Sequence, residues 1–175
     1  MKLSIRVAGA DKIRGKLAAM GARLRDLGPA YLRSSVVVLT AAQGRIRADG
    51  PGWPPTAETE RGSPLYRSGA LFRSLQVGGE GNVQEILANG IRVGSNLRTP
   101  DGQYNIARLQ QYGTGPITPK NGKLLVFEIN GHKVFSKGTK GVPPRPFLFI
   151  SGDDAQRVAG VFSSYVMGGG TNVSS

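Results

Sequence analysis

The sequence predicts an α+β domain in which a small antiparallel sheet of about four or five strands packs on a long central helix, with a further helix towards each end of the chain. Two observations support this prediction. Asn-Gly, the strongest short-range hairpin signal, stands at 89–90 and at 130–131 between segments rich in β-branched residues. Apolar side chains recur at three- and four-residue spacing in other segments, as they do on one face of a helix.

Three segments carry the helical spacing. In residues 11–27 the apolar positions are Ile13, Leu17, Met20 and Leu24. Gly28-Pro29 ends that helix and starts the next, which runs to about Arg47; its apolar run at 36–39 predicts a central helix wrapped by other elements. Asp153-Asp154 place negative charge at the start of the last helix, where it favours the helix dipole.

The remaining segments are strands, short helices and loops. Hairpins are predicted over 83–94 and 123–136, a strand over 2–7, and short helices over 68–76 and 104–111. Residues 48–64 form a long loop, and 168–175 a flexible glycine- and serine-rich tail. We therefore expect one domain over 1–167.

Composition narrows the classes of function. The 175 residues carry a net charge of +12, which attracts polyanions or acidic proteins, and contain no cysteine. No apolar run has transmembrane length, and the N-terminus lacks the apolar core of a signal peptide. We expect a protein made in a reducing cytoplasm that does not contact a membrane.

No segment carries recognisable reactive chemistry. Helix capping explains Asp153-Asp154, and a solvated loop explains Glu58 and Glu60. His132, the one histidine, follows a turn glycine, where an exposed or strand-pairing side chain is expected rather than a general base. The sequence predicts neither an enzyme nor a cofactor or metal site.

The basic excess has two interpretations. Ten of the 23 Lys/Arg lie in residues 1–48, and a second cluster surrounds the 123–136 hairpin. They form either solvated faces and protected sheet edges, or a surface for DNA or an acidic protein. No DNA-reading motif accompanies them. The candidate contacts to DNA or an acidic partner are Lys12, Lys16, Arg23, Lys120, Lys133, Lys137 and Lys140.

Five motifs occur in a characteristic order: Gly-Trp-Pro-Pro at 52–55, Leu-Tyr-Arg-Ser-Gly-Ala-Leu-Phe-Arg-Ser-Leu at 65–75, Val-Gly-Ser-Asn at 93–96, Tyr-Asn-Ile-Ala-Arg-Leu-Gln-Gln-Tyr-Gly at 104–113, and Pro-Pro-Arg-Pro-Phe-Leu at 143–148. In this order they resemble the tailed-phage virion morphogenesis proteins, also called tail completion proteins, over about residues 30–166. Gln110-Gln111-Tyr112 stands where His-Gln-Phe is usual, Asn105 where alanine is usual, and Phe149 where glycine is usual.

The resemblance implies a non-enzymatic structural protein at the head–tail junction of the virion, similar to the tail-terminator proteins that form six-fold rings. Its partners would be other copies of itself, the tail tube protein and the head connector or stopper protein, with non-specific contact to genomic DNA in the channel. The alternative is a basic nucleic-acid-binding protein without enzymatic activity.

The motifs supply the candidate interface residues, which are Trp53, Tyr66, Arg67, Gly69, Leu71, Tyr112, Gly113, Arg145, Pro146 and Phe147. Trp53 either covers the core beneath its loop or is an exposed anchor. Arg145 is held extended between two prolines, and its planar guanidinium suits a bidentate contact with a carboxylate or with carbonyl groups. We expect that contact to be internal, to the 65–71 segment, and the alternative is a contact across a protomer boundary.

Overall fold

The computed structural model describes residues 9–48, 50–54, 65–66, 68–120, 122–129 and 131–168. Within them the chain forms an α+β fold, as predicted. Its elements are the helices α1 (Ala10–Arg25), α2 (Gly28–Arg47), α3 (Ala70–Ser74), α4 (Ile106–Tyr112) and α5 (Gly152–Met167), and the strands β1 (Asn82–Leu87), β2 (Gly90–Ser95), β3 (Leu125–Ile129) and β4 (His132–Ser136). The strand predicted at 2–7, most of the 48–64 loop, Arg67 and the tail beyond Gly168 lie outside the described residues.

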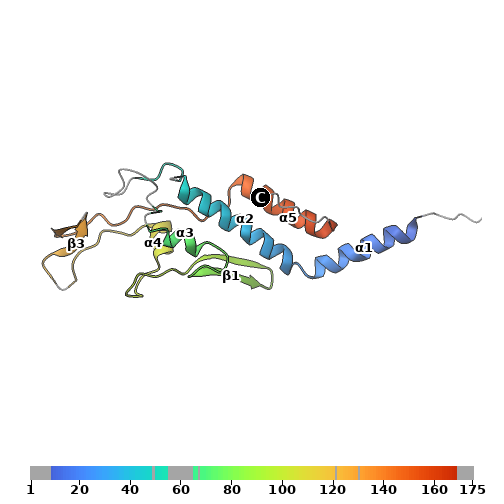
Figure 1. Cartoon of the computed structure of the whole chain (residues 1–175), viewed down its shortest axis with the longest axis horizontal. Coiled ribbons are helices and arrows are strands. Elements are labelled where there is room, and N and C mark those ends of the chain that lie inside the picture. The colour runs from blue at the N-terminus through green and yellow to red at the C-terminus, as the bar shows by residue number, and fades with distance from the viewer. Residues whose placement is uncertain are drawn as a thin grey trace, which may run out of the picture.

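Helix α2 forms the centre of the domain. Helix α5 runs antiparallel along one side of it and the β1–β2 hairpin covers another (Figure 1). Tyr31 of α2 meets Phe162 of α5 edge-to-face at 5.4 Å between ring centroids. One face of α2 stays open, since Leu32 and Val36 are exposed. The expectation that α2 is wrapped on all sides was therefore wrong for this face.

The core lies between the C-terminal half of α2 and the segments that follow it in sequence. Leu39, Ala42 and Ile46 project from one face of α2, at the three- and four-residue spacing of a helix. Leu65 and side chains from α3, its C-cap, α4 and the extended segment near the C-terminus close over them, namely Leu71, Phe72, Leu75, Ala107 and Phe147.

The two hairpins form where the Asn-Gly signals predict them, but they do not join. Within the described residues the strands form two separate two-stranded antiparallel sheets rather than one sheet of four or five strands. Only β1–β2 packs closely on α2; β3–β4 stands away from the core at one end of the elongated molecule (Figure 1). Local turn chemistry determines each hairpin, whereas the joining of two hairpins depends on contacts distant in sequence.

The β3–β4 hairpin is carried on a ribbon, which we call the arm and which comprises residues 114–120, 122–129 and 131–142. Ile117 and Thr139 exchange backbone hydrogen bonds of 3.0 and 2.9 Å, and the Thr114 amide donates to the Val142 carbonyl at 2.9 Å. Gly141 is required here, because a Cβ at this residue would lie 2.2 Å from the Gly115 carbonyl oxygen. The described residues of the arm thus form a ribbon of two antiparallel segments of the same chain.

Helix α5 begins with a capping box and an ion pair. The Ser151 hydroxyl accepts from the Asp154 amide, and the Asp154 carboxylate accepts from the Ser151 amide at 3.0 Å. Arg45, at the end of α2, donates to the same carboxylate, and both side chains are largely buried. Burial alone raises the pKa of Asp154, but hydrogen bonds from Ser151 and the contact with Arg45 outweigh it, so its pKa lies below the ordinary value.

We expect Arg45→Ala to lower the free energy of unfolding by about 3 kcal/mol at pH 7, because it leaves a buried carboxylate without its cation. A carboxyl whose folded-state pKa is depressed stabilises the fold above its unfolded pKa, near 4, and loses that contribution as pH falls through the lower folded value. Urea unfolding should therefore show a smaller effect of the substitution in acid. Arg14→Ala, which breaks an exposed pair with Asp11, is the control and should change little at either pH.

Candidate functional site

Arg145 is the polar centre of the region where the motifs meet. Its side chain is only 3% exposed. Nε and Nη2 both donate to the Pro54 carbonyl oxygen, at 3.1 and 3.0 Å, and Nη1 donates to Gln110 Oε1 at 3.4 Å. The contact is internal, as expected, but its partners are the Pro54 carbonyl and Gln110, and none of the described residues of the 65–71 segment accepts from the guanidinium. Burial lowers the pKa of the Arg145 guanidinium, which still stays charged at neutral pH.

The end of α4 holds the extended segment that follows Arg145. Gln111 Oε1 accepts from the amides of Phe147 and Leu148, at 3.1 and 3.0 Å, and its Nε2 donates to the Leu148 carbonyl at 3.1 Å. The Arg145 amide donates to the Gln110 carbonyl at 2.7 Å. One glutamine side chain therefore pairs with this backbone as a neighbouring strand would.

Two glycines let the backbone come close at this site. Gly113 has φ 70° and ψ −175°, a region that only glycine occupies readily, and a Cβ there would lie 2.6 Å from the Val142 carbonyl oxygen. Gly50 has φ 62°, and a Cβ there would lie 2.1 Å from the Trp53 indole. The indole packs against the core cluster, so Trp53 covers the core.

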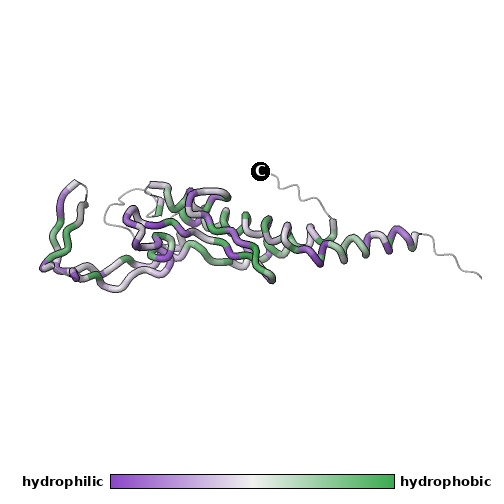
Figure 2. The backbone as a smooth tube through the Cα atoms, turned by 90° about the horizontal axis from the view of Figure 1, so that it is seen from below, coloured by the Kyte–Doolittle hydropathy of each residue, from purple (hydrophilic) through white to green (hydrophobic). Residues whose placement is uncertain are grey.

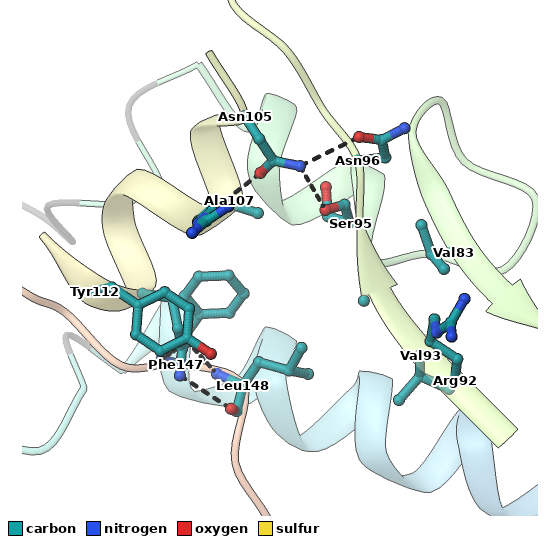
Figure 3. A pocket seen from close by; sticks show the side chains of 13 residues that line it. Val83, Arg92, Val93, Ser95, Asn96, Asn105, Ala107, Tyr112, Phe147 and Leu148 are labelled. Carbon is teal, nitrogen blue, oxygen red and sulfur yellow. Dashed lines mark hydrogen bonds between the residues drawn. The ribbon is translucent and has the colours of Figure 1, made fainter. Parts of the chain in front are cut away.

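A cavity of about 380 Å³ opens beside this region (Figure 3). Its walls come from the β1–β2 hairpin, α4 and the extended segment, and they include Val93, Ala107, Phe147 and Leu148. Polar groups at the rim are amides and hydroxyls together with Arg92 and Arg108, and the lining contains no carboxylate or histidine. Such a cavity can bind the apolar part of a side chain or ligand on its walls and hydrogen-bond to polar groups of that ligand at its rim.

The structure separates the candidate interface residues into buried and exposed ones. Leu71, Arg145 and Phe147 are buried, and Gly69 begins α3 in the left-handed region at φ 66°. Tyr66 packs edge-to-face on Phe72 yet stays 45% exposed, and Tyr112 is 74% exposed. Pro146 is also exposed. Among the described candidates, Tyr66, Tyr112 and Pro146 are thus the ones whose side chains are exposed, and Arg67 lies outside the described residues.

The basic candidates lie at the two ends of the molecule. Lys12 and Lys16 are exposed on α1, and Lys120, Lys133, Lys137 and Lys140 are exposed on or beside the arm. Arg23 differs, because its Nη1 donates to the Val166 carbonyl at 3.2 Å and its guanidinium lies against Gly168, at the C-terminal end of α5. A cation there is favoured by the helix dipole, so Arg23 has a structural role.

The described residues also bear on two other classes of function. They contain no group of three or more His, Asp or Glu side chains placed to share a metal ion. None of the helices in the described ranges combines the length and apolar character of a membrane span.

Sequence reasoning missed the residues that hydrogen-bond to the backbone of 145–149. Gln110 and Gln111 belong to the 104–113 motif. Nothing in the sequence shows that the Gln110 carbonyl and the Gln111 side chain bond the backbone of the extended segment in place of a strand. Arg45 was also missed, although its Nη1 donates to the carbonyls of Phe147 and Phe149 and its guanidinium lies 3.8 Å from the Phe149 ring centroid. The one signal in the sequence was that Arg45 lies in the last turn of a predicted helix.

Among known proteins, no family model matches this chain, and no curated protein or solved structure is significantly similar to it.

Gly113→Ala should destabilise the protein by about 2 kcal/mol, because alanine is strained at this φ and its Cβ collides with backbone. Gly115→Ala is a matched control two residues away, where φ is not positive and a Cβ meets nothing within 4 Å. Thermal unfolding of both variants tests this, and equal melting temperatures would contradict it.

Arg145→Ala should lower the free energy of unfolding by about 1 to 3 kcal/mol, since it leaves the Pro54 carbonyl and Gln110 without their donor. Arg145→Lys should recover little, because an ammonium cannot reproduce the planar guanidinium that donates to Pro54 O through Nε and Nη2 and to Gln110 through Nη1. The exposed Arg108→Ala is the control, and urea unfolding is the measurement. A full recovery by lysine would mean that charge alone matters here.

Proposed function

We propose that this chain is a ring-forming structural protein of the head–tail junction of a tailed phage, which completes or terminates the tail and joins it to the head connector. The observation that carries the proposal is the convergence of motifs. The Trp-Pro loop, the Gln-Gln-Tyr-Gly helix end and the Pro-Arg-Pro-Phe-Leu segment are distant in sequence, yet Arg145 and Gln111 bond them together. The motifs behind the resemblance to tail completion proteins thus belong to one packed unit.

The chemistry of that unit also supports a structural role. Its polar groups are an arginine and glutamines whose hydrogen bonds go to backbone and to one another. They are positioned to hold a surface rigid, and rigid presentation favours protein assembly because little conformational entropy is lost on binding. Tyr66 and Tyr112 remain exposed on that surface, and tyrosine is enriched where protein surfaces meet.

Sizing of the purified protein by native mass spectrometry and electron microscopy tests the proposal. We expect a closed ring, six-fold by analogy with tail terminators, that persists from about 0.1 M to 1 M salt, because apolar contacts are not screened. In a phage genome carrying this chain, Arg145→Ala should reduce joined particles while separate heads and tails accumulate. Normal joining by that variant, if it expresses at wild-type level, would contradict the role given to Arg145.

The nucleic-acid alternative predicts different behaviour in the same experiment. A salt-sensitive attraction to duplex DNA would show the logarithm of the affinity falling steeply with the logarithm of salt concentration. If the protein is a monomer at every salt concentration and binds DNA in this way, the proposed function is wrong and the alternative is supported.

A further inference from the structure

The outer edge of β2 has no strand partner among the described residues, because β2 pairs there with β1 alone. The Asn96 amide donates to the Gly81 carbonyl at 2.6 Å, one step beyond the last register pair of that ladder. Hydrogen-bonded and non-bonded pairs alternate along an antiparallel ladder, so Gly94 directs its N–H and C=O to β1 and Val93 directs its own outward. No described residue hydrogen-bonds to the Val93 backbone. This edge is therefore free to bond to a further strand.

The free edge opens on the cavity of about 380 Å³ (Figure 3). Residues 92–96 form one wall of it, and α4 with Phe147 and Leu148 forms the opposite wall. Gly94 adds no side chain to this space, and a glycine inside a strand often marks a place where another backbone comes close. An extended segment lying along β2 can thus bond to the Val93 backbone and place one apolar side chain in the cavity.

The charges at the rim favour an acidic segment. The lining contains no carboxylate and two guanidinium groups, those of Arg92 and Arg108. Arg92 is matched by Glu85 at 2.7 Å, whereas Arg108 is exposed and pairs with none of the described carboxylates. A carboxylate on an incoming segment would therefore meet an uncompensated cation, and a lysine in the same place would be repelled.

The arm does not meet these requirements. Residues 114–142 carry five lysines against one glutamate. Within one copy the arm also lies at one end of the molecule, away from the β1–β2 hairpin (Figure 1 and Figure 2). Its position excludes the arm of the same copy as the occupant, and its charge disfavours the arm of a second copy. An acidic segment of a different protein fits the cavity better than either.

We propose that an extended acidic segment of a partner protein adds to β2 as a third strand, with one apolar side chain in the cavity and a carboxylate beside Arg108. In this mode of recognition the backbone bonds supply affinity, and the pocket and the charge supply selectivity. The added strand would also stabilise β1–β2, since a hairpin of two strands is marginal by itself. The inference goes beyond the proposed function and does not require that copies of the chain form a ring.

A labelled peptide tests the strand addition, with a central phenylalanine flanked by alternating glutamate and valine. Fluorescence anisotropy with the full-length protein should show saturable binding, and hydrogen exchange should slow across residues 90–96. A strand directs alternate amides to its neighbour. Two isomers, N-methylated at one alternate set of amides or at the other, should therefore differ at least about tenfold in affinity, because only one of them loses its bonds to β2.

Arg108→Glu tests the charge at the rim. It should weaken binding of the acidic peptide at least about tenfold, because it places a carboxylate where the peptide brings its own. Arg33→Glu is the matched control, since it makes the same change in net charge at an exposed residue of α2 outside the cavity lining. It should leave the affinity within about twofold, because exposed charges far apart are screened by salt.

The outcomes are distinct. Absence of saturable binding by the acidic peptide would overturn the proposal, and equal affinities of the two N-methylated isomers would overturn strand addition. Tighter binding of a peptide with the sequence of residues 132–140 would assign the edge to the arm of a second copy and overturn the acidic partner. Ring formation is measured separately by the sizing described above, so failure of this inference is distinguishable from failure of the proposed function.

Discussion

The fold depends on satisfying the backbone of an extended, partly buried segment that has no strand partner among the described residues. Residues 145–149 cross the domain in extended form, and Phe147 fills the core. Buried amides and carbonyls must be bonded, or each costs on the order of 1–3 kcal/mol. Here side chains make those hydrogen bonds. Gln111 bonds to the backbone of Phe147 and Leu148, and Arg45 donates to the carbonyls of Phe147 and Phe149. The two helices α2 and α4 are thereby fixed to the same stretch of chain.

Arg145 extends this arrangement to the Trp-Pro loop. Its guanidinium is desolvated and bonded to the Pro54 carbonyl, while the preceding residue, Trp53, packs against the core. A loop that packs through an aromatic ring and is bonded through its backbone has few alternative conformations. The exposed residues around it, such as Tyr112 and Pro146, are thus presented in a fixed geometry, which lowers the entropic cost of binding a partner.

Local signals in the sequence predicted much of this structure. Asn-Gly specified both hairpins, and the spacing of Leu39 and Ile46 identified the helix that carries the core. The prediction failed where the outcome depends on distant contacts. Nothing near residue 123 shows that its hairpin stays apart from the first, and the partner of Arg145 lies 91 residues away. The planar guanidinium of Arg145 predicted a bidentate contact to carbonyl groups or a carboxylate, but it could not identify which loop folds back to provide it.

The charge distribution bears on how copies of this protein meet. A net charge of +12 opposes any contact that places like surfaces together. Lysines concentrate on the arm and on α1, at the two ends of the elongated protomer, so a symmetric contact at either end would pair cations with cations. The net charge therefore favours a contact of either basic end with an acidic partner or a polyanion over a contact between two basic ends.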